Sequence, residues 1–108
     1  MFCGVKPFDF RKEIEYSCES IVSKRVLEKQ SGNISLFAFD KGQKLSEHTA
    51  PFDALVQVLE GKAEITIGKF PNILSEGEAI VMPANVPHAV SAVEKFKMLL
   101  TMIKDQYV

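Results

Sequence analysis

Turn-forming residues interrupt this chain at short, regular intervals, and this spacing limits the folds that it can adopt. Glycines at positions 61, 68 and 77 each lie beside a charged residue, between short apolar runs. Hardly any apolar spacing of the helical period occurs, whereas strand-length runs recur throughout. Closely spaced short strands are typical of antiparallel sandwiches and barrels. We therefore predict an all-β fold built as a single small β-barrel.

The predicted strands follow an N-terminal arm. Residues 1–19 mix aromatic and charged side chains, and Asp9 is expected to cap a short helical turn that places Phe10 and Ile14 on one side. The strands are predicted at Ser20–Glu28, Ile34–Asp40, Lys44–His48, Asp53–Leu59, Lys62–Ile67, Phe70–Leu74, Ala79–Met82, Pro87–Val93 and Phe96–Ile103. A length of 108 residues then favours one domain over residues 1–108.

Charge and composition exclude several partners. Thirteen Lys and Arg residues against fourteen Asp and Glu residues give a net charge of −1, so no basic field is present to attract nucleic acid. The least charged run, 79–93, is too short to span a membrane. The N-terminal charges do not match the layout of a signal peptide, so we expect a cytoplasmic protein. Cys3 and Cys18 are not spaced as metal ligands are, and we assign them no role.

The chain's two histidines end two stretches that both begin with glycine. The first stretch reads Gly42-Gln-Lys-Leu-Ser-Glu-His48, and the second reads Gly77-Glu-Ala-Ile-Val-Met-Pro83-Ala-Asn-Val-Pro-His88. These stretches resemble the two sequence motifs of the cupin family. The family's first motif is a Gly, five residues, His-x-His, a Glu and a later Gly. Its second motif is a Gly, five residues, Pro-x-Gly, a His and an Asn.

The resemblance covers roughly residues 32–103 and implies the jelly-roll barrel, or double-stranded β-helix, of the cupins. It also implies a site at the barrel mouth, where cupins hold a divalent transition metal with three His and one Glu. His48 and His88 occupy two of these four positions, and Ala50 and Ala54 occupy the other two. In the second motif an Asn and an Ala, at positions 85 and 92, replace the Gly and the Asn. A cupin fold with a partly lost metal site is therefore expected.

Three uses of the histidines remain open. Each can be a neutral imidazole hydrogen-bonded inside the barrel, the two can hold a small organic anion, or they can hold a metal completed by water or substrate. An imidazole has an ordinary pKa of about 6.5, so a protonated pair can bind a carboxylate or a phenolate. Among Glu47, Thr49 and Asp53, the best candidate for a further metal ligand is Asp53, because the preceding Pro51-Phe52 can disturb the strand and re-aim it. Met98 and Met102 are expected to fill the core.

The two alanines also predict a cavity. Replacing a His and a Glu by Ala50 and Ala54 removes bulk and charge together, which leaves an apolar hollow with Val56 on its wall. The predicted ligand-binding residues are thus His48, His88, Ala50, Ala54 and Val56. The sequence favours a barrel that binds a small, partly apolar anion. The alternative is a metal-dependent enzyme similar to cupin dioxygenases, isomerases or decarboxylases, with a metal on the two histidines.

Two predicted strands are apolar on both faces, Ala54–Leu59 and Met98–Ile103. In the first, alternation and the resemblance place Ala54, Val56 and Val58 inward. For the second, the sequence leaves the inward face undecided. A strand that is apolar on both sides needs a second cover outside the barrel, so a homodimer is expected.

Overall fold

The computed structural model describes residues 5–104, which contain one short 3-10 turn and nine strands. The prediction of an all-β chain is confirmed, and each predicted strand segment corresponds to an observed one. In the described part no helix is both long and apolar enough to cross a membrane. The elements are η1 (Phe10–Lys12), β1 (Ile21–Lys29), β2 (Gly32–Phe39), β3 (Lys44–His48), β4 (Asp53–Glu60), β5 (Lys62–Ile67), β6 (Phe70–Ser75), β7 (Ala79–Met82), β8 (His88–Ala92) and β9 (Phe96–Ile103).

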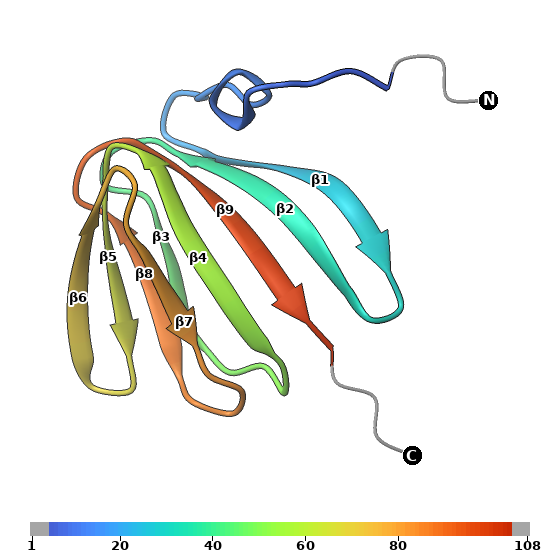
Figure 1. Ribbon diagram of the computed structural model, residues 1–108. Helices are drawn as coiled ribbons and strands as arrows, with labels where there is room; N and C mark the ends of the chain where they lie inside the picture. Colours follow the sequence, from blue (N-terminus) through green and yellow to red (C-terminus); the bar gives the residue numbers. More distant parts are fainter. Residues whose placement is uncertain (1–4, 105–108) are drawn as a thin grey trace.

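The strands form two antiparallel sheets that face each other. The five-stranded sheet has the order β1-β2-β9-β4-β7, and the four-stranded sheet has the order β3-β8-β5-β6. In Figure 1 strands of the two sheets overlap, and β1 and β2 extend beyond the region that the smaller sheet covers. Chain crossings between the sheets, such as β4 to β5, make this the jelly-roll arrangement.

The turn from β4 to β5 requires glycine. Gly61 has φ +85°, and a Cβ atom on it would lie 2.0 Å from the carbonyl oxygen of Lys95. Only glycine combines this backbone conformation with so close an approach. The turn carries the chain from the larger sheet to the smaller one, so it helps to close one end of the sandwich.

The inner faces of the two sheets form the main core. Ala54, Val56 and Val58 are buried there, as alternation along β4 and the resemblance predicted. The register also settles β9, because Met98 lies opposite Val58 and Leu100 lies opposite Val56. The even-numbered residues of β9 therefore point inward, and Leu99 points outward.

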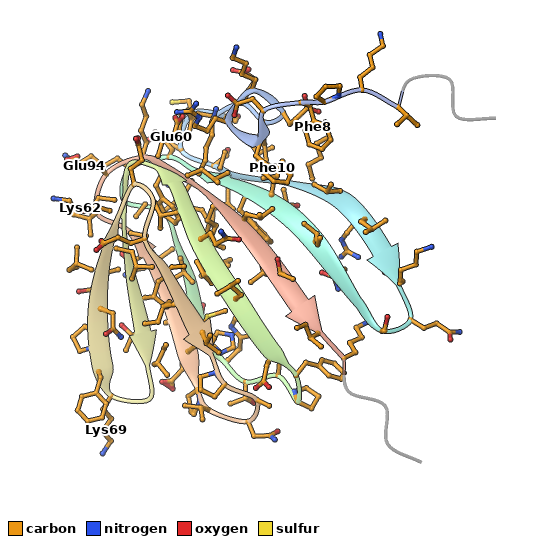
Figure 2. All side chains as sticks on the ribbon, viewed as in Figure 1. Phe8, Phe10, Glu60, Lys62, Lys69 and Glu94 are labelled. Atoms are coloured by element: carbon orange, nitrogen blue, oxygen red, sulfur yellow. The ribbon has the colours of Figure 1, made fainter. Side chains whose placement is uncertain are left out.

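The outer face of the larger sheet is covered at one end by the N-terminal arm. Ile14 is 4% exposed and packs in a second buried cluster with Leu36, Ala38 and Leu99. The Asp9 side chain caps η1 by accepting a hydrogen bond from the backbone N–H of Arg11 at 2.9 Å, and Phe10 joins the same cluster, as predicted. Figure 2 shows Phe10 between the arm and the sheet. Over Leu99 the cover is thus the chain's own arm rather than a second subunit.

A buried lysine fastens the arm to the sheet. Lys97 is 7% exposed, donates a hydrogen bond to the backbone carbonyl of Arg11 and lies 4.0 Å from the Glu60 carboxylate. The Tyr16 hydroxyl donates to the same carboxylate at 2.7 Å. Burial, with the hydrogen bond and charge of Glu60, raises the pKa of Tyr16, so its hydroxyl remains a donor. Cys18 is an exposed free thiol, and Cys3 lies outside the described residues.

Candidate functional site

An irregularity in β3 directs His48 into the sandwich. Leu45 pairs with Val90 and His48 pairs with His88, so two residues of β3 lie opposite the single residue between those partners in β8. Successive side chains in a strand alternate between faces, and an extra residue reverses that alternation. His48 therefore points to the same inner side as Leu45, although the two are an odd number of residues apart.

The loops beside His48 and His88 are tied together. The backbone N–H of Asn85 donates to the Ala50 carbonyl, and that of Ala84 donates to Asp53 Oδ1, both at 2.8 Å. Asn85 has φ +64°, so Asn replaces the motif's Gly with one of the few other residues that tolerate this conformation. Asp53 is exposed and is used in fixing the β7–β8 turn, so the expectation that it completes a metal site is not met.

The two imidazoles, which we call the His pair, are in direct contact. Their Nε2 atoms are 3.1 Å apart, and their ring centroids are 4.3 Å apart with an interplanar angle of 70°. At the opposite side of each ring, Nδ1 contacts a backbone carbonyl, Ser46 O at 3.0 Å for His48 and Val86 O at 3.3 Å for His88. His48 is exposed and His88 is 7% exposed, so the pair leads from solvent into the interior.

A cavity of about 130 Å³, which we call the mouth cavity, adjoins the His pair. Its wall contains both histidines, Ala50 and Ala54, and otherwise aliphatic, aromatic and thioether side chains. The predicted apolar hollow is therefore present beside the two alanines. Val56 does not line it, because this residue is fully buried in the core, one inward position further along β4 than Ala54.

The environment of His88 favours its neutral form. Burial, followed by the charge of His48, lowers the pKa of His88 below its ordinary value of 6.5, and the hydrogen bond to Val86 opposes this shift only in part. Across residues 5–104, no group of three or more His, Cys, Asp or Glu side chains is arranged to hold a metal ion. A metal here would depend on the His pair and on donors of other types.

Sequence reasoning missed several residues of the cavity wall. Phe37 and Phe52 contribute aromatic surface, and Met82 joins Met98 and Met102 on the wall. Met82 directly precedes the motif proline at position 83 and is the partner of Ala54 across the β4–β7 ladder. Its position in the second motif was visible in the sequence, but the pairing that brings it beside Ala54 was not.

Comparison with known families gives one match over most of the chain. A family model described as Cupin domain matches residues 35–104. No curated protein matches the chain.

Solved structures agree with this match. A conserved protein of unknown function from Streptococcus pyogenes is 39% identical over 98% of this chain and 93% of its own, with a TM-score of 0.91. A cupin 2 conserved barrel domain protein from Leptotrichia buccalis is 42% identical over 90% of this chain, with a TM-score of 0.87, but this chain spans only 47% of its length. A cupin superfamily protein from Desulfitobacterium hafniense is 28% identical over 95% of this chain and 94% of its own, with a TM-score of 0.89.

Proposed function

This chain belongs to the cupin family, and on that premise we propose that its barrel binds a small, partly apolar anion in the mouth cavity. The anionic group lies at the His pair, and the apolar body lies against Ala50 and Ala54. The observation that carries the proposal is the meeting of two Nε2 atoms, 3.1 Å apart, at the edge of an otherwise apolar cavity.

The hydrogen-bonding pattern of the His pair is stable only when a positive charge is present. A backbone carbonyl only accepts hydrogen bonds, so each Nδ1 that contacts one carries the ring's proton. In two neutral rings, both Nε2 atoms are then bare acceptors that face each other. Two lone pairs 3.1 Å apart repel unless a cation lies between or beside them. A shared proton or a metal ion meets this requirement.

That positive charge supplies the attraction for an anion. A carboxylate or phenolate beside the protonated or metallated pair forms a charge-assisted interaction at the edge of an apolar cavity. The doubly protonated pair is disfavoured, because two imidazolium rings in contact repel each other and because the pKa of His88 is already lowered. One charge shared by both rings is the state that binds.

The size of the cavity limits the apolar body of the ligand. A volume of about 130 Å³ is close to that of an engineered apolar cavity of about 150 Å³ that binds benzene. The wall is apolar except at the His pair, so a single polar group at one end of the ligand is matched. Monocarboxylates or phenols with one six-membered ring, or a short branched chain, fit this description.

A second candidate function is metal-dependent catalysis, and one observation favours it. Metal-bound histidines commonly donate their other ring N–H to a backbone carbonyl, as both Nδ1 atoms can here. Metal–nitrogen bonds of about 2.0–2.1 Å at an angle of roughly 90–110° separate two such nitrogens by about 2.9–3.4 Å. The observed 3.1 Å fits. His48 and His88 would hold the ion, which would act as a Lewis acid on a bound substrate.

Calorimetric titration of the metal-free and the Zn(II)-loaded protein with benzoate, phenol and short branched monocarboxylates tests the proposal. We expect binding that His48→Ala weakens by about tenfold or more, since a charged partner is removed. Ala50→Leu should weaken the binding of benzoate more than the binding of formate, because the larger side chain fills the cavity. Glu47→Ala is the matched control, because Glu47 is exposed on the same strand and does not line the cavity. Equal affinities in all three variants would contradict the proposal.

A further inference from the structure

Three of the chain's four methionines line the same cavity as its only two histidines. Met82 ends β7, and Met98 and Met102 lie on the inner face of β9. Met82 is 5% exposed and Met98 is 2% exposed, so these thioethers are held in the protein interior. The cavity therefore joins every described methionine to both imidazoles.

Two of these methionines flank one particular position. Met82 is the direct partner of Ala54 across the β4–β7 ladder, and Met102 is its direct partner across the β4–β9 ladder. Directly opposed side chains on one face of a sheet have Cβ atoms about 4.5–5.5 Å apart. Ala54 occupies the position where the resemblance predicts a glutamate ligand. Thioethers thus lie on both sides of the place from which a carboxylate is missing.

The charge of the cavity lining, together with its donor atoms, determines which ion the cavity prefers. No Asp or Glu is among the described residues that line it, and the donors are neutral imidazoles and thioethers. The Born cost of moving an ion out of water rises with the square of its charge, so a singly charged ion is penalised about a quarter as much as a divalent one. Without a carboxylate to offset that penalty, a monovalent ion is favoured over a divalent one.

The donor types select among monovalent ions. Thioether sulfur is a soft ligand that favours Cu(I), and imidazole also suits copper, whereas carboxylates and water suit hard ions. Met102 Sδ has a 4.0 Å contact with Asn33 Nδ2, which leaves its second lone pair for a metal. Among the described residues, the Met82 sulfur has no hydrogen-bond donor, and its side chain lines the cavity.

We propose that the His pair, with Met82 and Met102, forms a Cu(I) site. This inference rests on the proposed function, because the His pair is the anchor in both. It differs in assigning the methionines as ligands and in naming a soft monovalent ion as the preferred cation. Core packing alone does not require methionine at these two positions, because leucine fills a core equally well.

Cu(I) affinity is measured by competition with bicinchoninate under anaerobic, reducing conditions, and Zn(II) affinity is measured by a parallel competition assay. The wild-type protein should bind one Cu(I) more tightly than one Zn(II). Met82→Leu and Met102→Leu should each weaken Cu(I) by about tenfold or more, while leaving Zn(II) within about twofold. Ile65→Leu is the control, because Ile65 is fully buried in the same core but does not line the cavity.

X-ray absorption of the Cu(I) protein gives a second readout that does not depend on affinities. It should show nitrogen and sulfur neighbours in the wild type, and the sulfur contribution should fall in the double Met82→Leu, Met102→Leu variant. Because Met→Leu nearly conserves volume, the variants should remain folded.

The outcomes separate this inference from the proposed function. If the pair binds Zn(II) or benzoate in a manner dependent on His48, but Cu(I) binding is absent or indifferent to both methionine substitutions, the inference is overturned and the proposed function stands. If His48→Ala and His88→Ala alter neither metal nor anion binding, both are overturned.

Discussion

His48 and His88 are direct partners across the β3–β8 ladder, and their Nε2 atoms lie 3.1 Å apart. They are separated by 40 residues in the chain. In each ring, Nδ1 also contacts the backbone carbonyl of the residue two positions earlier. The two rings are therefore in direct contact beside the mouth cavity.

Restoring the missing ligands should produce a tight divalent site that destabilises the metal-free protein. In the Ala50→His, Ala54→Glu variant, the new carboxylate lies between Met82 and Met102 in a position that is 7% exposed. An unpaired buried charge lowers the free energy of unfolding by about 3 kcal/mol or more. We expect a lower melting temperature in chelator, with recovery in Zn(II), by calorimetry. Ala54→Gln is the matched control and should not recover.

Stability should fall as pH decreases from neutral. The folded-state pKa of His88 is lowered below its unfolded value of 6.5. Below pH 6.5 His88 takes up a proton of its own in the unfolded state, whereas in the folded state it can only share one with His48, so unfolding becomes more favourable until the pH reaches the folded pKa of His88.

Urea denaturation of the metal-free protein between about pH 5 and pH 7.5 measures this effect. The lowered pKa values of Asp9 and Asp40 act near their ordinary value of 3.8, which separates them from the histidine window. His88→Gln should flatten the curve in that window. An unchanged slope in the variant would show that His88 is not the group responsible.

We expect a homodimer formed through the part of the larger sheet that the arm leaves open. Leu27, Val81 and Ile103 are exposed by 50%, 54% and 62%, and Val81 and Ile103 join Leu55 around an apolar hollow. Covering this surface with a second copy should bury more than about 1,000 Å² in total. Light scattering on the wild type should give twice the chain mass.

Lysine substitutions test the location of this interface. Val81→Lys and Leu55→Lys should convert the dimer to a folded monomer, because each would place a charge in an apolar interface. Ile73→Lys is the matched control, since Ile73 is 53% exposed on the smaller sheet. A wild-type monomer at micromolar concentration would refute the expectation.

Because Lys97 contacts both the arm and Glu60, substituting Glu60 should weaken the packing of the arm on the sheet. Glu60→Ala leaves a buried ammonium without its carboxylate and the Tyr16 hydroxyl without its acceptor. We expect a loss of about 1–3 kcal/mol in the free energy of unfolding. Tyr16→Phe removes only the hydroxyl and should lose about 1 kcal/mol. Limited proteolysis near residue 16 should accelerate in the first variant more than in the second.

The sequence by itself determined the strands and the inward face of β4. Glycines between short apolar runs gave the turns, because these positions need backbone conformations that other residues resist, as at Gly61. Alternation along β4, together with the resemblance to the cupins, correctly assigned Ala54, Val56 and Val58 to the interior. The alanines at two motif positions indicated a cavity, and it is present.

Tertiary structure alone decided which side chains meet in that cavity. The alternation of β3 would turn His48 away from Leu45, and only the irregular pairing with β8 brings it inward. Met82 and Met102 meet at Ala54 through ladders between strands far apart in sequence, whereas Val56 lies too deep to line the cavity. The local sequence likewise does not predict that the N-terminal arm packs over Leu99. Local pattern fixes the face of a residue, but register and long-range packing fix its neighbours.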